Sequence, residues 1–137
     1  MTTAQHVFRL DASSGVPFYR QIIDQVLLAV GDGRLKAGTQ LPTVRQLAVD
    51  LSVNLNTVAK AYRELEHEGV IELRHGAGAF VAASALGRRG PDRFRAAQAA
   101  VTDTVKRLRD RGLSDEEIRR LFESELSRAV KAGGHRG

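Results

Sequence analysis

The sequence predicts a mainly α-helical fold with one small β-hairpin, on three observations. Two short apolar stripes at helical spacing lie between residues 44 and 65. A glycine-tipped pair of apolar runs follows at 70–81, and two longer amphipathic segments come after a Gly/Pro segment. This order predicts an N-terminal winged helix-turn-helix followed by a two-helix hairpin.

The first short helix has a clear start signal. Thr43 and Gln46 have the spacing of a capping box, in which each side chain satisfies a backbone amide of the other residue. The helix should therefore begin near Val44. Its apolar face consists of Val44, Leu47, Ala48 and Leu51.

A second helix is predicted from about Asn56 to His67. Ser52 and Asn54 interrupt the first stripe with residues that favour turns and caps. Gly69 supplies the left-handed conformation that commonly ends a helix. The new apolar stripe consists of Val58, Ala61, Tyr62 and Leu65.

Mostly small, neutral residues face outward at the start of this second helix. In a helix-turn-helix this end meets base edges in the major groove, and its positive dipole end favours phosphate. Asn can also pair with adenine. For Asn54, a role as a helix cap explains its position equally well, because most Asn residues at helix starts are caps. The outward residues are Asn54, Leu55, Asn56, Thr57, Ala59 and Lys60.

A β-hairpin, or wing, is predicted after Gly69. The run 70–73 alternates loosely, residues 75–78 form a turn, and 79–81 resume an apolar run. Arg74 and His75 precede the tip, where side chains or the amides of Gly76 and Gly78 can approach the nucleic-acid backbone. A surface hairpin with no partner is the alternative, and we rank it lower because the hairpin follows a helix-turn-helix.

Three linked motifs in this order resemble the winged-helix domain of the GntR family of bacterial transcription regulators. They are GTQLPTVRQLA at 38–48, NTVAKAYREL at 56–65 and HGAG at 75–78. The resemblance implies that Thr43, Arg45 and the start of the second helix contact double-stranded DNA, that the wing enters the minor groove, and that 17–35 forms a supporting helix. Other branches of the family have arginines at Leu55 and Ala59, so the bases contacted should differ.

A linker at 84–91 separates the predicted DNA-binding domain, residues 1–83, from the C-terminal helices. Its glycines, proline and charges are typical of linkers, and Asp92 can cap the helix that follows. That helix runs from Arg93 for about five turns and ends near Gly112. Its apolar residues are Phe94, Ala97, Val101, Val105 and Leu108.

The last helix begins with a second capping box, Ser114 with Glu117, and a hydrophobic staple, Leu113 with Ile118. Its apolar stripe consists of Ile118, Leu121, Phe122, Leu126, Ala129 and Val130, before a flexible tail at 133–137. Two such helices bury too little surface alone, so we expect 92–132 to form a homodimer. A similar short segment occurs in the YtrA-like branch of the GntR family. Packing against its own DNA-binding domain is the less favoured alternative.

Charge is unevenly distributed along the chain. Residues 1–83 hold eight basic and eight acidic side chains, whereas 84–111 hold eight and three. A DNA-facing surface on the first domain therefore requires segregation, with the acids Glu64, Glu66, Glu68 and Glu72 turned away. The densest basic cluster is formed by Arg88, Arg89, Arg93 and Arg95, which is either a solvated linker or a contact to flanking phosphates.

Composition excludes several other classes of protein. No apolar run has the length of a membrane span, no signal peptide opens the chain, and cysteine is absent, so we expect a cytoplasmic protein without disulfides. The four histidines are scattered, which favours no metal site, cofactor or enzyme. We expect a repressor that occupies an operator. A protein-protein adaptor is the alternative, and the sequence identifies no small-molecule effector.

Overall fold

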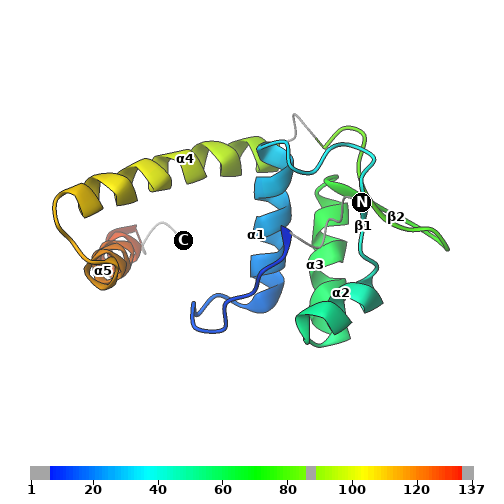
Figure 1. The fold of residues 1–137 in the computed structure, drawn as a ribbon, viewed down its shortest axis with the longest axis horizontal. Helices are drawn as coiled ribbons and strands as arrows, with labels where there is room; N and C mark the ends of the chain where they lie inside the picture. The colour runs from blue at the N-terminus through cyan, green and yellow to red at the C-terminus, as the bar shows by residue number, and fades with distance from the viewer. Residues whose placement is uncertain (1–6, 86–88, 134–137) are drawn as a thin grey trace. The chain divides into compact units, whose positions relative to one another are not determined.

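The computed structural model describes residues 7–85 and 89–133, and the chain divides into two compact units, residues 1–97 and 98–137. The expected mainly α-helical fold with a β-hairpin is confirmed (Figure 1). In chain order the elements are α1 (Phe18–Gly31), β1 (Gln40–Leu41), α2 (Val44–Leu51), α3 (Leu55–His67), β2 (Ile71–Arg74), β3 (Gly78–Val81), α4 (Arg89–Asp110) and α5 (Asp115–Gly133).

The core of the first unit lies where α1 and α2 pack against α3. Figure 1 shows α1 and α3 side by side, with α2 at one end of α3. The predicted apolar stripes face inward, because Leu47, Ala48, Val58, Ala61, Tyr62 and Leu65 are all buried. They pack with α1 residues Ile22, Ile23, Val26, Ala29 and Val30. Burial of these stripes is the main stabilisation of the helix-turn-helix.

The first helix is shorter than the expected span of 17–35. It ends at Gly31, and the chain then turns through Gly33, whose φ of +86° is left-handed. Glycine adopts that conformation at little cost, so the turn ends the helix four residues early. Leu35 then donates its backbone N–H to the Ala29 carbonyl at 3.0 Å and is buried in the core.

The wing belongs to a three-stranded antiparallel sheet with the order β1-β3-β2. Glu72 pairs with Phe80, and Arg74 pairs with Gly78, so the hairpin is confirmed. The third strand, β1, pairs Gln40 with Phe80 and was not predicted, since two residues are too few to show alternation. β1 leads directly into α2, which ties the wing to the helix-turn-helix.

Two glutamines of α1 hold the segment that precedes it. Gln21, which is buried, accepts a hydrogen bond from the Asp11 backbone N–H and donates to the Asp11 and Val16 carbonyls. Gln25 exchanges the same pair of bonds with the backbone of Arg9, at 2.9 and 2.7 Å. The amide side chains thereby replace the backbone partners that a strand would supply.

The start of α4 packs within the first unit. Pro91 is buried, and a Cβ added to Gly31 would lie 2.5 Å from the Pro91 carbonyl oxygen. α4 begins at Arg89, so the expected cap at Asp92 was wrong, and Asp92 lies inside the first turn. Proline fits a first helical turn because its missing N–H is not needed there. Residues 86–88 of the expected linker lie outside the described residues.

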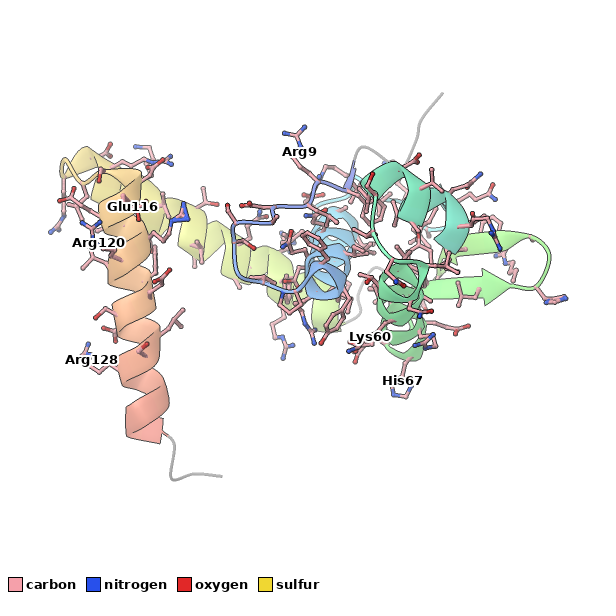
Figure 2. The ribbon with its side chains drawn as sticks, turned by 90° about the horizontal axis from the view of Figure 1, so that it is seen from below. Arg9, Lys60, His67, Glu116, Arg120 and Arg128 are labelled. Atoms are coloured by element: carbon pink, nitrogen blue, oxygen red, sulfur yellow. The ribbon has the colours of Figure 1, made fainter. Side chains whose placement is uncertain are left out.

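The second unit consists of the rest of α4, a short turn and α5. The capping box is confirmed: Ser114 N donates to Glu117 Oε1 at 2.8 Å, and Glu117 N donates to Ser114 Oγ at 3.1 Å. Figures 1 and 2 show that α5 runs away from the axis of α4 instead of lying along it. A short turn joins the two helices as predicted, but they do not lie along each other as in a closed hairpin, and Val101, Leu121 and Leu126 of their apolar stripes stay exposed.

Candidate nucleic-acid interface

The N-terminus of α2 is fixed by the predicted capping box. Gln46 N donates to Thr43 Oγ1 at 3.0 Å, and Thr43 N donates to Gln46 Oε1 at 2.9 Å. The Thr43 oxygen is thus already used as an acceptor, and its hydroxyl proton is left to donate. Arg45 lies exposed in the first turn of the same helix. The cap therefore fixes the backbone from which Arg45 extends.

A buried tyrosine of α3 anchors this same corner, although its place in the apolar stripe predicted only a core residue. Tyr62 is fully buried, and its hydroxyl donates to the Pro42 carbonyl at 2.7 Å. Burial raises the pKa of the Tyr62 hydroxyl well above its ordinary value of 10.0. The phenol therefore stays a neutral donor and joins α3 to the residue that precedes the Thr43 cap.

Asn54 lies in the turn between α2 and α3 and caps α3. Ser52 adopts a left-handed conformation with φ of 55°, and Asn54 then caps α3 by accepting from Asn56 N at 2.7 Å. The capping explanation is confirmed. The cap uses one of the two acceptor positions of Asn54 Oδ1, and the amide nitrogen of this exposed side chain remains a donor for a base.

The outer face of α3 begins with the predicted residues. Leu55 and Asn56 are exposed, whereas Thr57 and Ala59 are half-buried. Lys60 is exposed but leans toward α1, where its Nζ lies 3.9 Å from the centroid of the Tyr19 ring (Figure 2). This cation–π contact directs the charge of Lys60 toward the N-terminal end of α1. Sequence periodicity gave no signal of it, because the two residues are 41 positions apart.

Acidic groups on this unit are only partly segregated. Glu64 lies 3.9 Å from the Arg20 guanidinium, and Glu64, Glu66 and Glu68 all lie in the C-terminal half of α3 or just beyond it, away from its start. Glu72 differs, since its Oε1 lies 3.1 Å from Arg74 Nη2 on the wing. Glu72 is therefore paired with Arg74, one of the residues predicted to contact DNA. Both residues are on β2 two positions apart, which places them on one face of the strand.

The tip of the wing requires its glycines. Gly76 and Gly78 have φ of +77° and +114°, conformations that other residues rarely adopt. A Cβ at Gly78 would also lie 3.2 Å from Gln40 Nε2, which donates to the Ala77 carbonyl at 3.1 Å. Gln40 thus braces the tip from β1, while His75 is exposed there.

Arg74 is held in place by two neighbours. Besides its ion pair with Glu72, its guanidinium carbon lies 4.2 Å from the centroid of the Phe80 ring on the adjacent strand. A guanidinium that stacks on a ring while bonding a carboxylate is oriented before any ligand arrives. The wing therefore offers one oriented, partly neutralised cation.

Seven of the eight predicted dimerisation residues lie in the second unit, and all of these but Ile118 are partly exposed. Ile118 is buried, Val105, Leu108 and Phe122 are half-buried, and Val101, Leu121 and Leu126 are 52%, 50% and 64% exposed. Exposed apolar side chains of this size mark an interaction surface where they are contiguous.

Phe94 is placed apart from this set. It lies in the first unit, where it lines a cavity of about 290 Å³ together with Ile23 and Leu27 of α1. Asp24 lines the same cavity, and burial raises the pKa of its carboxyl despite the opposing charge of Arg20. Phe94 thus contributes to the surroundings of α1, whereas the other predicted dimerisation residues belong to the second unit.

Within residues 7–85 and 89–133, none of the helices has the length and apolar content that a bilayer crossing requires. The same residues contain no group of three or more His, Cys, Asp or Glu side chains placed to hold a metal ion.

Two α-helices that meet at a tight turn, with a wing braced on them through β1, define a winged helix-turn-helix protein. The sequence model of the gntR family of bacterial regulatory proteins matches residues 18–81. The uncharacterised regulator YhcF of Bacillus subtilis is 34% identical over 77% of this chain and 86% of its own length. This chain belongs to the GntR family.

Two further comparisons confirm the likeness to the YtrA-like branch. The transcriptional repressor YtrA of Bacillus subtilis is 43% identical over 58% of this chain, which spans 61% of the length of that repressor. The solved structure of YtrA from Sulfolobus acidocaldarius, a GntR-family transcription factor, matches with a TM-score of 0.52 and 39% identity. That match covers 56% of this chain and 80% of the YtrA chain.

Proposed function

We propose that this protein is a homodimeric transcription repressor of the cytoplasm that binds a two-fold symmetric DNA operator. The observation that supports this most strongly is the exposed N-terminal end of α3. It follows α2 after a tight turn in which Asn54 caps α3, and the same domain carries a wing. The first turn of α3 holds no acidic residue, so the positive end of its helix dipole favours a polyanion. The repressor activity named for the relative YtrA of Bacillus subtilis supports the direction of regulation.

The predicted contacts divide into two kinds. In this proposal residues 54–57, the cap and first turn of α3, meet base edges, as the start of a recognition helix does. The sugar-phosphate backbone is contacted, in the same proposal, by Thr43, Arg45, Arg74, His75 and the wing glycines Gly76 and Gly78. Lys60 is also assigned to the sugar-phosphate backbone, because its stacking on Tyr19 directs its charge toward the side of α3 that faces α1.

Pairing through the second unit supplies the two-fold symmetry. The exposed apolar side chains of α4 and α5 need a cover, and a second copy provides one that is complementary by symmetry. Sedimentation at micromolar concentration should give a dimer, and Leu121→Asp with Leu126→Asp should give a monomer that keeps the melting temperature of the first unit. A wild-type monomer would contradict pairing.

Selection of bound fragments from a random DNA pool tests operator binding directly. We expect an inverted repeat whose half-sites are spaced by whole helical turns. Arg45→Ala should weaken binding to every recovered sequence, whereas Asn56→Ala should alter the sequence preference. Absence of any salt-dependent, sequence-selective binding would refute the proposal and favour a protein-protein adaptor.

The arginine cluster at the start of α4 is a separate part of the proposal. Arg93 and Arg95 are exposed, and Arg88 lies outside the described residues. Replacing the four arginines 88, 89, 93 and 95 with Gln should flatten the dependence of operator affinity on salt, because fewer counterions are released. If the slope of log affinity against log salt concentration did not change, these arginines would not contact DNA and would only be solvated.

A further inference from the structure

An apolar strip lies at the centre of the proposed DNA-contacting face. Leu55 is the first residue of α3 and is 44% exposed, although its side chain is fully apolar. Ala59 lies four positions later, on the same face of the helix and half-buried. The two side chains therefore present methyl groups along one line of the helix surface.

Two cations of α3 lie next to this strip in sequence, and one of them, Arg63, is exposed one turn beyond Ala59 on the same face. The charge nearest in sequence is Lys60, and it is held on the Tyr19 ring on the side of α3 that faces α1. Asn54 is occupied as the cap of the helix, with its oxygen on Asn56 N. Leu55, which is exposed, can therefore meet a ligand directly, with Arg63 beyond Ala59 available for a flanking phosphate.

The chemistry of the major groove selects one partner for such a strip. Each base pair presents hydrogen-bond donors and acceptors there, and thymine alone adds an apolar group, its C5-methyl. Leucine and alanine side chains can neither donate nor accept. Opposite a G·C pair they would strip water from polar edges without replacing its hydrogen bonds, which is unfavourable. Opposite thymine they bury a methyl group instead.

We propose that Leu55 and Ala59 recognise the C5-methyl groups of thymines in each half-site, an inference that rests on the proposed function. Leu55 meets one thymine at the entry of α3 into the groove, and Ala59 meets a neighbouring base step one turn further along. The half-site recognised by this chain is accordingly rich in A·T pairs. The exposed Asn56 side chain strengthens that preference, because Asn pairs with adenine N6 and N7.

The test uses the wild-type protein and the best sequence recovered from the random pool. Each half-site thymine is replaced in turn by deoxyuridine, which differs only in lacking the methyl group. Loss of one buried methyl should lower affinity about four-fold. We expect this loss at one or two positions and little change elsewhere. Uniform insensitivity in DNA that is still bound selectively would overturn the inference alone, whereas no selective binding would overturn the proposed function as well.

A pair of variants then assigns the methyl contact. In Leu55→Ala, deoxyuridine at the position assigned to Leu55 should no longer weaken binding, because the contact is already lost. Val49→Ala is the matched control, since Val49 on α2 is 72% exposed and lies outside the strip. Its deoxyuridine profile should equal that of the wild type. Full sensitivity retained in Leu55→Ala would exclude Leu55 as the contact.

Discussion

Replacing Tyr62 with phenylalanine should destabilise the first unit and loosen the corner that presents Arg45. The tyrosine is fully buried, and its hydroxyl makes a hydrogen bond of 2.7 Å to the Pro42 carbonyl, 20 residues away. Phenylalanine keeps the ring and its packing, so the substitution removes one buried donor and little else.

The magnitude follows from what the carbonyl loses. A typical buried hydrogen bond contributes about 1 kcal/mol net, and an acceptor left unsatisfied costs about 1–3 kcal/mol. Pro42 is itself buried, so water does not readily replace the tyrosine. We therefore expect the free energy of unfolding to fall by about 1–3 kcal/mol. For a unit of this size, each kcal/mol lowers the melting temperature by roughly 4–8 °C.

Alkaline pH supplies a second signature of the same bond. Burial raises the pKa of Tyr62 in the folded state above its ordinary value of 10.0. Between those two pKa values the unfolded chain releases the proton and the folded chain keeps it, so wild-type stability falls as pH rises above about 10. Tyr62→Phe lacks this loss. The stability gap between wild type and variant should therefore be constant below pH 10 and narrow above it.

Thermal or denaturant unfolding from pH 7 to 11, followed by circular dichroism, measures both effects. Tyr19→Phe is the matched control, because Tyr19 is the other of the two tyrosines and is only half-buried. A melting temperature of Tyr62→Phe within about 1 °C of the wild type would refute the argument from burial. A stability gap that stayed constant above pH 10 would refute the linkage argument.

Three further substitutions test other contacts. Gly31→Ala should lower the free energy of unfolding by about 1–3 kcal/mol, because the added Cβ clashes with the Pro91 carbonyl. Replacing Gly by Ala inside a helix ordinarily raises that free energy, so the sign of the change measured by chemical unfolding tests the contact. Glu72→Gln should free Arg74 to neutralise about one more phosphate, so log affinity for DNA should fall more steeply with log salt concentration. Stability should change little, because the ion pair is exposed. Fluorescence anisotropy at several salt concentrations measures the slope. Asp24→Asn should stabilise the fold slightly at neutral pH but not near pH 3, since burial raises the pKa of that carboxyl and favours its protonated form; melting curves at both pH values check this.

The features predicted correctly from the sequence are those set by local rules. Both capping boxes, Thr43 with Gln46 and Ser114 with Glu117, join residues three positions apart. Helix periodicity likewise identified the buried stripes of α2 and α3, because the repeat of an α-helix fixes which residues share a face. These signals need no knowledge of the rest of the fold.

The features missed depend on contacts between distant parts of the chain. Nothing in the local pattern joins Lys60 to Tyr19, or Tyr62 to Pro42. The early start of α4 was missed for a related reason. A proline beside glycine is typical of a linker, and only its packing against Gly31 shows that it belongs to a first helical turn.

Ion pairs within the formally neutral N-terminal domain limit its attraction for a polyanion. Arg20 and Arg74 lie near the acids Glu64 and Glu72, so part of the positive charge is already offset within the domain. Each of these pairs is about half exposed, and water screens it, so DNA can compete for the arginines. One domain should consequently bind weakly and depend mainly on base contacts and shape. In a dimer, the second domain binds at a high effective concentration, which raises the affinity of the pair without any added charge.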